Sequence, residues 1–144
     1  MRANRVRPHA TGKQELDDLR ALINRDLDDA GLSGLSADRS FATSYNAALQ
    51  SAKMAIACAG YRVVAKQGHH QVGFEAAELD VGPSIASLVA YFETCRRKQN
   101  LLDYDAANIV SDTEAAEILD LEKVREFKQA IEAWIAKNHP SLGL

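Results

Sequence analysis

The stretch RRKQNLLDYD, which begins at Arg96, places polar side chains where the preceding residues of a helix would bury apolar ones. At about 100° per residue, Gln99 and Asp103 point within roughly 20° of the apolar direction of that helix, and Arg96 points within roughly 40° of it. Arg97 and Lys98 point well away. A guanidinium, an amide and a carboxylate along one line must be satisfied by one another, by water or by a partner. The stretch is therefore either a set of structural pairs, Arg96 with Asp103 or another acid, or a site.

The other residues with reactive or aromatic side chains are better explained by a structural role than by a catalytic or binding role. His69 and His70 are adjacent, and neighbouring positions on a helix point about 100° apart, so the two side chains do not share a face. No third ligand with metal-binding spacing accompanies them. Trp134 falls at core spacing, where packing explains an aromatic side chain. The sequence therefore predicts no metal and no cofactor.

Composition limits the classes of function. The 144 residues are 47% apolar and carry a net charge of -3, which predicts one domain with its own core and disfavours coating nucleic acid by bulk charge. Basic residues gather locally at two places, at residues 2–7 and at residues 96–98. Cys58 and Cys95 lie in apolar helical patterns, which indicates buried thiols in a reducing compartment. No window approaches the apolar length of a membrane span, and we expect a cytoplasmic protein.

The elements that must position these residues are helices, because apolar residues recur at helical spacing nearly throughout and alternating β-branched runs are absent. Helix starts carry recognisable signals: Thr11 with Gln14, Ser36, Gly82-Pro83, and Ser111 with Glu114. The predicted helices cover residues 12–30, 36–60, 70–79, 83–102 and 111–138. Residues 61–70 form a connector that is extended at 61–64, and a loop begins at Asp103.

These elements predict an all-α fold, an antiparallel four-helix bundle with an additional short helix. Residues 1–10 read as a flexible N-terminal arm, and residues 11–144 read as a single helical domain. The polar line of residues 96–103 would then lie at one end of the bundle.

Several local pieces together resemble the HEPN-domain family of small helical bundles from bacterial toxin–antitoxin and defence systems. The pieces are ACAGYRV, GHH, RRKQNLLDYD and VSDTEA, in this order, and the resemblance covers roughly residues 11–140. It implies a metal-independent ribonuclease motif at a helix end, which in the similar branch reads Arg-Asn-x-x-Asp-Tyr. Asn100, Asp103 and Tyr104 match that motif, but Gln99 occupies the arginine position.

The departure at Gln99 bears on the chemistry. When a ribose 2′-OH attacks its own phosphate, the enzyme must place a cation beside the phosphorane and a group that moves protons. Gln99 carries no charge, and a tyrosine such as Tyr104, with an ordinary pKa near 10, is a poor base at neutral pH. Arg96 lies nearly one turn earlier on the same face and could substitute in part.

Three functions follow as hypotheses. The first is a non-catalytic or weakly active RNA- or partner-binding module of a toxin–antitoxin or defence system, with a degenerate ribonuclease motif. The second is an active HEPN ribonuclease toxin that leaves 2′,3′-cyclic phosphate ends. The third is a plain helical interaction domain whose polar seam specifies a dimer. The resemblance implies a homodimer, with RNA, a cognate antitoxin, a toxin or a nucleotidyltransferase as further partners.

Overall fold

The computed structural model describes residues 6–32, 34–64, 69–104 and 119–144, and for residues 37–38, 69–70 and 99–104 the description covers the helical backbone alone. The elements in chain order are β1 (Val6–Pro8), α1 (Lys13–Ala30), α2 (Ala37–Cys58), β2 (Tyr61–Val63), α3 (His69–Val81), η1 (Pro83–Ile85), α4 (Ala86–Tyr104), α6 (Leu121–Asn138) and η2 (Pro140–Leu142).

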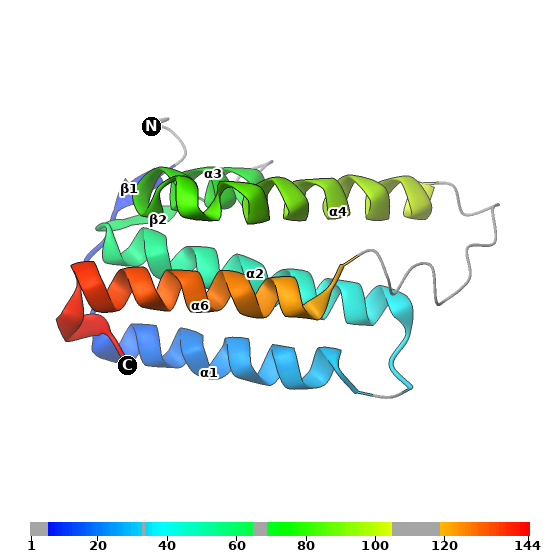
Figure 1. Ribbon diagram of the computed structural model, residues 1–144, viewed down its shortest axis with the longest axis horizontal. Coiled ribbons are helices and arrows are strands. Elements are labelled where there is room, and N and C mark those ends of the chain that lie inside the picture. Colours follow the sequence, from blue (N-terminus) through cyan, green and yellow to red (C-terminus); the bar gives the residue numbers. More distant parts are fainter. Residues whose placement is uncertain (1–5, 33, 65–68, 105–118) are drawn as a thin grey trace.

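Four long helices make up the body of the molecule. Helices α1, α2, α4 and α6 lie roughly along its long axis, and each runs antiparallel to the one before it (Figure 1). The shorter α3 packs against α2 and against the first part of α4. The prediction of an all-α antiparallel four-helix bundle with an additional short helix is confirmed.

Helix α2 is the central helix, and its sequence explains how closely its neighbours approach. The Ser36 hydroxyl accepts a hydrogen bond from the backbone N–H of Arg39 at 3.3 Å, as predicted for an N-cap. Small side chains then occupy buried positions along the helix: Ala47, Ala48, Ala52 and Ala55. Gly73 of α3 belongs to the same close contact, because a Cβ atom there would lie 3.4 Å from a methyl carbon of Leu49.

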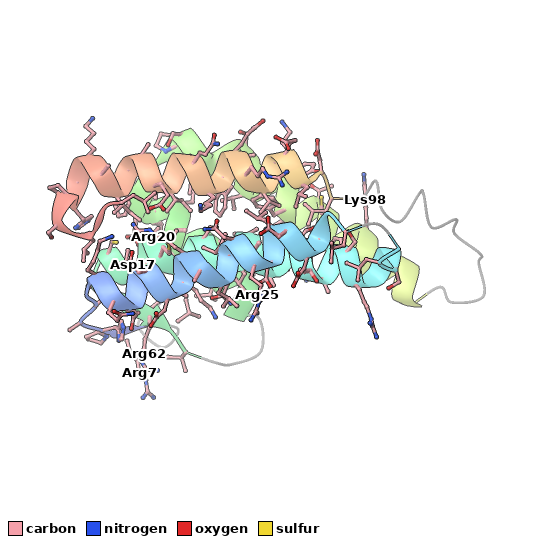
Figure 2. The ribbon with its side chains drawn as sticks, turned by 90° about the horizontal axis from the view of Figure 1, so that it is seen from below. Arg7, Asp17, Arg20, Arg25, Arg62 and Lys98 are labelled. Atoms are coloured by element: carbon pink, nitrogen blue, oxygen red, sulfur yellow. The ribbon has the colours of Figure 1, made fainter. Side chains whose placement is uncertain are left out.

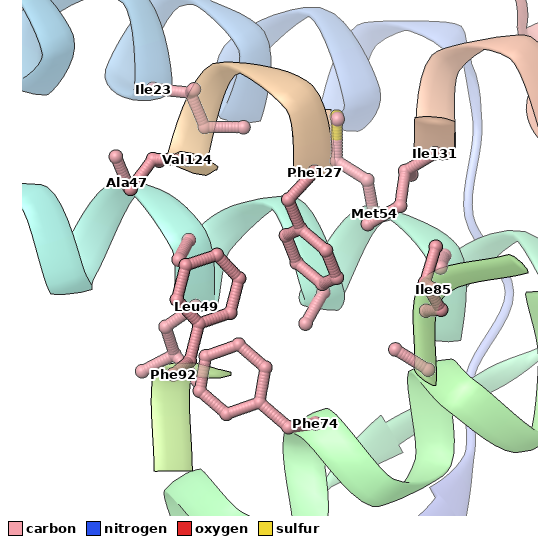
Figure 3. Packing of buried hydrophobic residues seen from close by; sticks show 14 of the residues in the cluster. Ile23, Ala47, Leu49, Met54, Phe74, Ile85, Phe92, Val124, Phe127 and Ile131 are labelled. Atoms are coloured by element: carbon pink, nitrogen blue, oxygen red, sulfur yellow. The ribbon is translucent and has the colours of Figure 1, made fainter. Parts of the chain in front are cut away.

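Three phenylalanine rings from three helices form the centre of the core. Ring centroids are 5.6 Å apart for Phe74 and Phe92, 5.1 Å for Phe92 and Phe127, and 6.0 Å for Phe74 and Phe127 (Figure 3). Tilted and edge-on arrangements of this kind are the favoured ones for aromatic pairs. The cluster therefore joins α3, α4 and α6 beside the middle of α2.

A buried arginine connects the first helix to the last. Arg20 is 4% exposed and donates to both carboxylate oxygens of Glu132 at 2.9 and 2.8 Å. It also donates to Asp17 at 2.9 Å and to the backbone carbonyl of Leu142 at 2.8 Å. The hydrogen bonds to Glu132 raise the pKa of Arg20, so this cation is permanent. It fixes α6 and η2 against α1.

The structure differs from the predicted arm at Val6–Pro8. These residues pair antiparallel with β2, with Val6 opposite Val63 and Arg7 opposite Arg62. Val6 is 8% exposed, and its burial together with the ladder gives this short segment a fixed place against the bundle. Gly60 turns the chain from α2 into β2 at φ 97°, a conformation that glycine adopts without strain.

Three helix boundaries also differ from the predictions. The capping box at Thr11 and Gln14 is wrong: Gly12 is the N-cap of α1, and the Thr11 hydroxyl donates to Glu15 instead, at 2.8 Å. Helix α4 continues to Tyr104, past the loop expected from Asp103.

The third difference is that residues 119–120 of the predicted helix over residues 111–138 are not helical. Helix α6 begins at Leu121, where the Asp120 carboxylate accepts from the backbone N–H of Glu122 at 3.0 Å. The backbone N–H of Asp120 donates to the Tyr91 hydroxyl at 2.8 Å, which ties this start to α4. The first part of that prediction, with the capping box at Ser111 and Glu114, lies outside the described residues.

Candidate functional site

The candidate site is the C-terminal part of α4, which lies at the end of the bundle opposite the two-stranded β1–β2 sheet (Figure 1). Cys95 is buried, Arg96 is half-buried, and Arg97 and Lys98 are exposed. This order confirms the helical phase predicted for the stretch, in which only Arg96 of the three cations turns toward the interior. Lys98 extends from the helix toward solvent at this end (Figure 2).

Arg96 forms an ion pair within its own helix. One terminal nitrogen of its guanidinium donates to a carboxylate oxygen of Glu93 at 3.1 Å, and the side chains are 31% and 14% exposed. The hydrogen bond from Arg96 to Glu93 raises the pKa of the arginine. The interpretation in which Arg96 pairs with an acid is therefore correct, and in the described part of the chain that acid is Glu93.

Tyr45 of α2 lies beside this pair. Its pKa is raised by burial first and then by the negative charge of Glu93, while the positive charge of Arg96 lowers it. Its ring stacks on Phe41, with centroids 5.7 Å apart, and meets the edge of Phe74 at the same distance. The aromatic neighbours thus hold the phenol next to two charged groups in a largely dry environment.

The pair leaves hydrogen-bonding groups unused. Within the described part of the structure, Nε of Arg96 and Oε1 of Glu93 are buried and have no hydrogen-bond partner. A buried polar group without a partner costs about 1 to 3 kcal/mol, and such groups collect at functional sites. The arrangement can hold a fixed cation, but the guanidinium is already turned toward a carboxylate and is not presented to a phosphate.

The remaining predicted site residues are placed only by their backbone. Gln99, Asn100, Asp103 and Tyr104 all belong to the last turns of α4, so the polar line does continue on a helix. Their side chains lie outside the described part of the structure. The structure consequently brings Arg96 together with Glu93 and Tyr45. The side-chain contacts of the four other predicted site residues stay predictions.

Sequence reasoning missed Glu93 and Tyr45 as neighbours of Arg96. The spacing of Glu93 and Arg96, three residues apart on a helix, is a signal that could have found the first. No local signal could have found Tyr45, because it comes from a different helix and reads as an ordinary core aromatic residue.

The other candidates from the sequence are as follows. His69 and His70 begin α3, and their side chains are outside the description. Among the residues that the structure describes, no group of three or more His, Cys, Asp or Glu side chains could hold a metal ion. Cys58 and Cys95 are buried thiols, as predicted, and burial raises the pKa of Cys58 to about 11.

The comparisons with known proteins add nothing to this geometry. No family model, curated protein or solved structure matches the sequence. The resemblance to HEPN domains therefore stays a prediction from the motif residues. Across the described residues, no helix combines the length and apolar character needed to cross a membrane.

Proposed function

We propose that this chain is a HEPN-like module with a degenerate ribonuclease motif, which binds a partner through the C-terminal part of α4 and cleaves RNA weakly or not at all. The observation that supports the proposal is the Arg96–Glu93 pair. Cleavage by attack of a 2′-OH requires a cation free to stabilise the phosphorane. The motif has Gln99 in the arginine position, and the nearest cation on the buried side is held by a carboxylate.

The exposed charges beside the motif favour an anionic partner. Arg97 and Lys98 both face solvent next to the polar line. Exposed cations at the end of a helix can contact phosphates without supplying chemistry. RNA is therefore the first partner to test, and a cognate antitoxin, toxin or nucleotidyltransferase is the alternative for a toxin–antitoxin or defence system.

The polar line also gives a reason for a homodimer. A buried pair with unused hydrogen-bonding groups gains if a second copy supplies partners for the same end of the bundle. We expect the C-terminal half of α4 to contribute to that interface. Sedimentation at micromolar concentration should show a species larger than 15.7 kDa, and a single species of that mass would contradict the dimer.

Catalytic competence is tested by restoring the missing cation. The unmodified protein, Gln99→Arg, and Gln99→Arg combined with Tyr104→Phe are incubated with a structured RNA under metal chelation, and 2′,3′-cyclic phosphate ends are measured. Gln99→Arg should raise cleavage, because a planar guanidinium can contact two phosphate oxygens, and Tyr104→Phe should remove the gain. Gln129→Arg, at an exposed position of α6, is the matched control.

The results separate the hypotheses. Robust cleavage by the unmodified protein would overturn the degenerate-motif proposal in favour of an active ribonuclease. If Gln99→Arg folds and still does not cleave, the motif acts in binding alone.

RNA binding is measured separately with a double variant. Arg97→Ala with Lys98→Ala should weaken binding and reduce its salt dependence, because two phosphate contacts are lost. Arg25→Ala with Lys137→Ala removes the same charge from exposed positions elsewhere and should leave binding nearly unchanged. If both double variants lose the same RNA affinity, the protein attracts RNA through its overall charge and not through Arg97 and Lys98. That result would favour a protein as the partner of this surface.

A further inference from the structure

A second site lies at the other end of the bundle from the α4 motif. A pocket of about 360 Å³ opens between the start of α1, the last turns of α2 and the two-stranded β1–β2 sheet. Its lining includes five residues with polar or charged groups: His9, Glu15, Lys53, Tyr61 and Arg62. Arg62 lies at the opposite end of the molecule from Lys98 (Figure 2). The volume falls within the range typical of small-molecule sites.

The β1–β2 sheet places two arginines where they repel each other. Arg7 and Arg62 are directly opposite in the antiparallel ladder, so their side chains leave the same face of the sheet, and both are exposed (Figure 2). Like charges directly opposite in a sheet are destabilising. Within the described residues, neither arginine has a carboxylate at ion-pair distance. An anion between or beside them would remove the repulsion.

The carboxylate in the pocket keeps its negative charge while it accepts hydrogen bonds, so it offsets one of the cations in the lining. Both oxygens of Glu15 lie within hydrogen-bond distance of Nε2 of His9, at 2.8 and 3.0 Å, and the Thr11 hydroxyl donates to Glu15 at 2.8 Å. The hydrogen bond from His9 is the main reason that the pKa of Glu15 is lowered. Because an ionised carboxylate only accepts hydrogen bonds, Nε2 of His9 carries the proton.

Lys53 adds a further positive charge from α2. It is exposed, it lines the pocket, and it forms no ion pair with any described carboxylate. The two cations of Lys53 and Arg62 outnumber the one carboxylate of Glu15, and they leave the pocket with a positive balance. The wall is therefore suited to a ligand with negative charge.

The rest of the lining is apolar. Leu19, Ile56 and Val63 contribute aliphatic surface, and the half-buried Tyr61 contributes an aromatic ring. A free inorganic anion would leave this surface unused. Apolar walls with a few converging charges are typical of sites for organic ligands, whose body packs against the walls while the charges fix its orientation.

We propose that this pocket binds a small phosphate monoester carried on an aromatic body. Arg62 would contact the phosphate through the planar guanidinium fork that matches two phosphate oxygens. Lys53 would contribute a point charge, and the aromatic body would lie against Tyr61 and the aliphatic wall. The site is independent of the function proposed for α4, because the two lie at opposite ends of the bundle.

Calorimetric titration of the full chain tests the proposal with 1-naphthyl phosphate, and with 1-naphthol and inorganic phosphate as its two halves. Naphthyl phosphate should bind at least about tenfold more tightly than either half, since only the whole molecule uses both the charges and the apolar wall. Arg62→Ala and Lys53→Ala should each weaken it by about tenfold. Arg25→Ala removes an exposed arginine from outside the pocket and should have no effect.

A thermal-shift measurement gives a second readout. Without ligand, Arg62→Ala should melt at or above the temperature of the unmodified protein, because its like-charge pair with Arg7 is removed. With naphthyl phosphate, the unmodified protein should gain more in melting temperature than Arg62→Ala does, because binding to the folded state stabilises it. Absence of saturable binding up to about 1 mM would overturn the proposal, as would equal binding of 1-naphthol or loss of binding in Arg25→Ala.

Discussion

The Arg96–Glu93 pair makes a direct prediction about stability. Truncating Arg96 to alanine should destabilise the fold more than the same change at Arg97, although the two arginines are adjacent in the sequence. Arg96 turns inward and holds Glu93 at 3.1 Å, whereas Arg97 faces solvent. Because both variants lose an arginine from the same helix, any difference in stability between them reports the direction in which the side chain points.

The magnitude follows from the exposure of the two partners. With Arg96 removed, the Glu93 carboxylate, 14% exposed, would lose the cation beside it. A charged group left without its partner at such low exposure costs about 1 to 3 kcal/mol. An exposed arginine such as Arg97 contributes less than about 1 kcal/mol. For a domain of this size each kcal/mol shifts the melting temperature by roughly 3 °C, so Arg96→Ala should melt about 3 to 9 °C lower.

Urea denaturation followed by circular dichroism measures both variants, and a double-mutant cycle with Glu93→Gln assigns the loss to the pair. The cost of Arg96→Ala should shrink by about 1 to 2 kcal/mol in the Glu93→Gln background, because no carboxylate is then stranded. Equal midpoints for Arg96→Ala and Arg97→Ala would refute the inward orientation. An unchanged cost in the cycle would show that Arg96 acts through packing of its methylene groups instead.

Three further predictions concern the bundle. Arg20→Ala should cost about 3 to 5 kcal/mol in urea denaturation, because Glu132, 12% exposed, would be left without its cation, whereas the exposed Arg39→Ala should cost less than about 1 kcal/mol. Gly60→Ala should cost about 1 to 2 kcal/mol because φ is 97°, while Gly31→Ala, with φ of -86° and ordinary contacts around its Cβ, should change the midpoint little. Cys58, whose pKa is raised to about 11, should react with a disulfide reagent at pH 8 at least about 100-fold more slowly than an unfolded thiol, and unfolding in urea should abolish the difference.

The helices were predictable because their signals are local and repeated. Apolar spacing predicted the extents of α1 and α2 to within a residue or two, and the hydroxyl of Ser36 caps α2 as its position indicates. The start of α6 at Leu121 was not predictable in the same way. Leu119 continues the apolar period, but Asp120 is the N-cap of α6, and its N–H donates to the Tyr91 hydroxyl of α4.

From the sequence, the candidate site could be predicted only as one face of one helix. Helical phase correctly separated Arg96 from Arg97 and Lys98, because it depends on spacing within a single element. It could not supply Tyr45, which reaches the same place from α2, nor the pocket formed by three separate segments at the other end. Of the β1–β2 ladder, only the extended backbone at residues 61–64 was predicted; the partner strand β1 was missed, because three residues are too few to show an alternating pattern.

The two inward-facing arginines show how a structural charge differs from a candidate site. Every nitrogen of the Arg20 guanidinium donates a hydrogen bond, to Glu132, Asp17 or the carbonyl of Leu142. Arg96, by contrast, uses one nitrogen on Glu93, and its Nε has no partner among the described residues. A bundle that can satisfy a buried arginine completely at one end has left hydrogen-bonding capacity unused at the other. The Arg96 side chain is 31% exposed, so a ligand or a second copy can contact its guanidinium, whereas the Arg20 side chain is 5% exposed and is closed to a further partner. This difference makes the end of α4, and not the Arg20 network, the place to look for a partner.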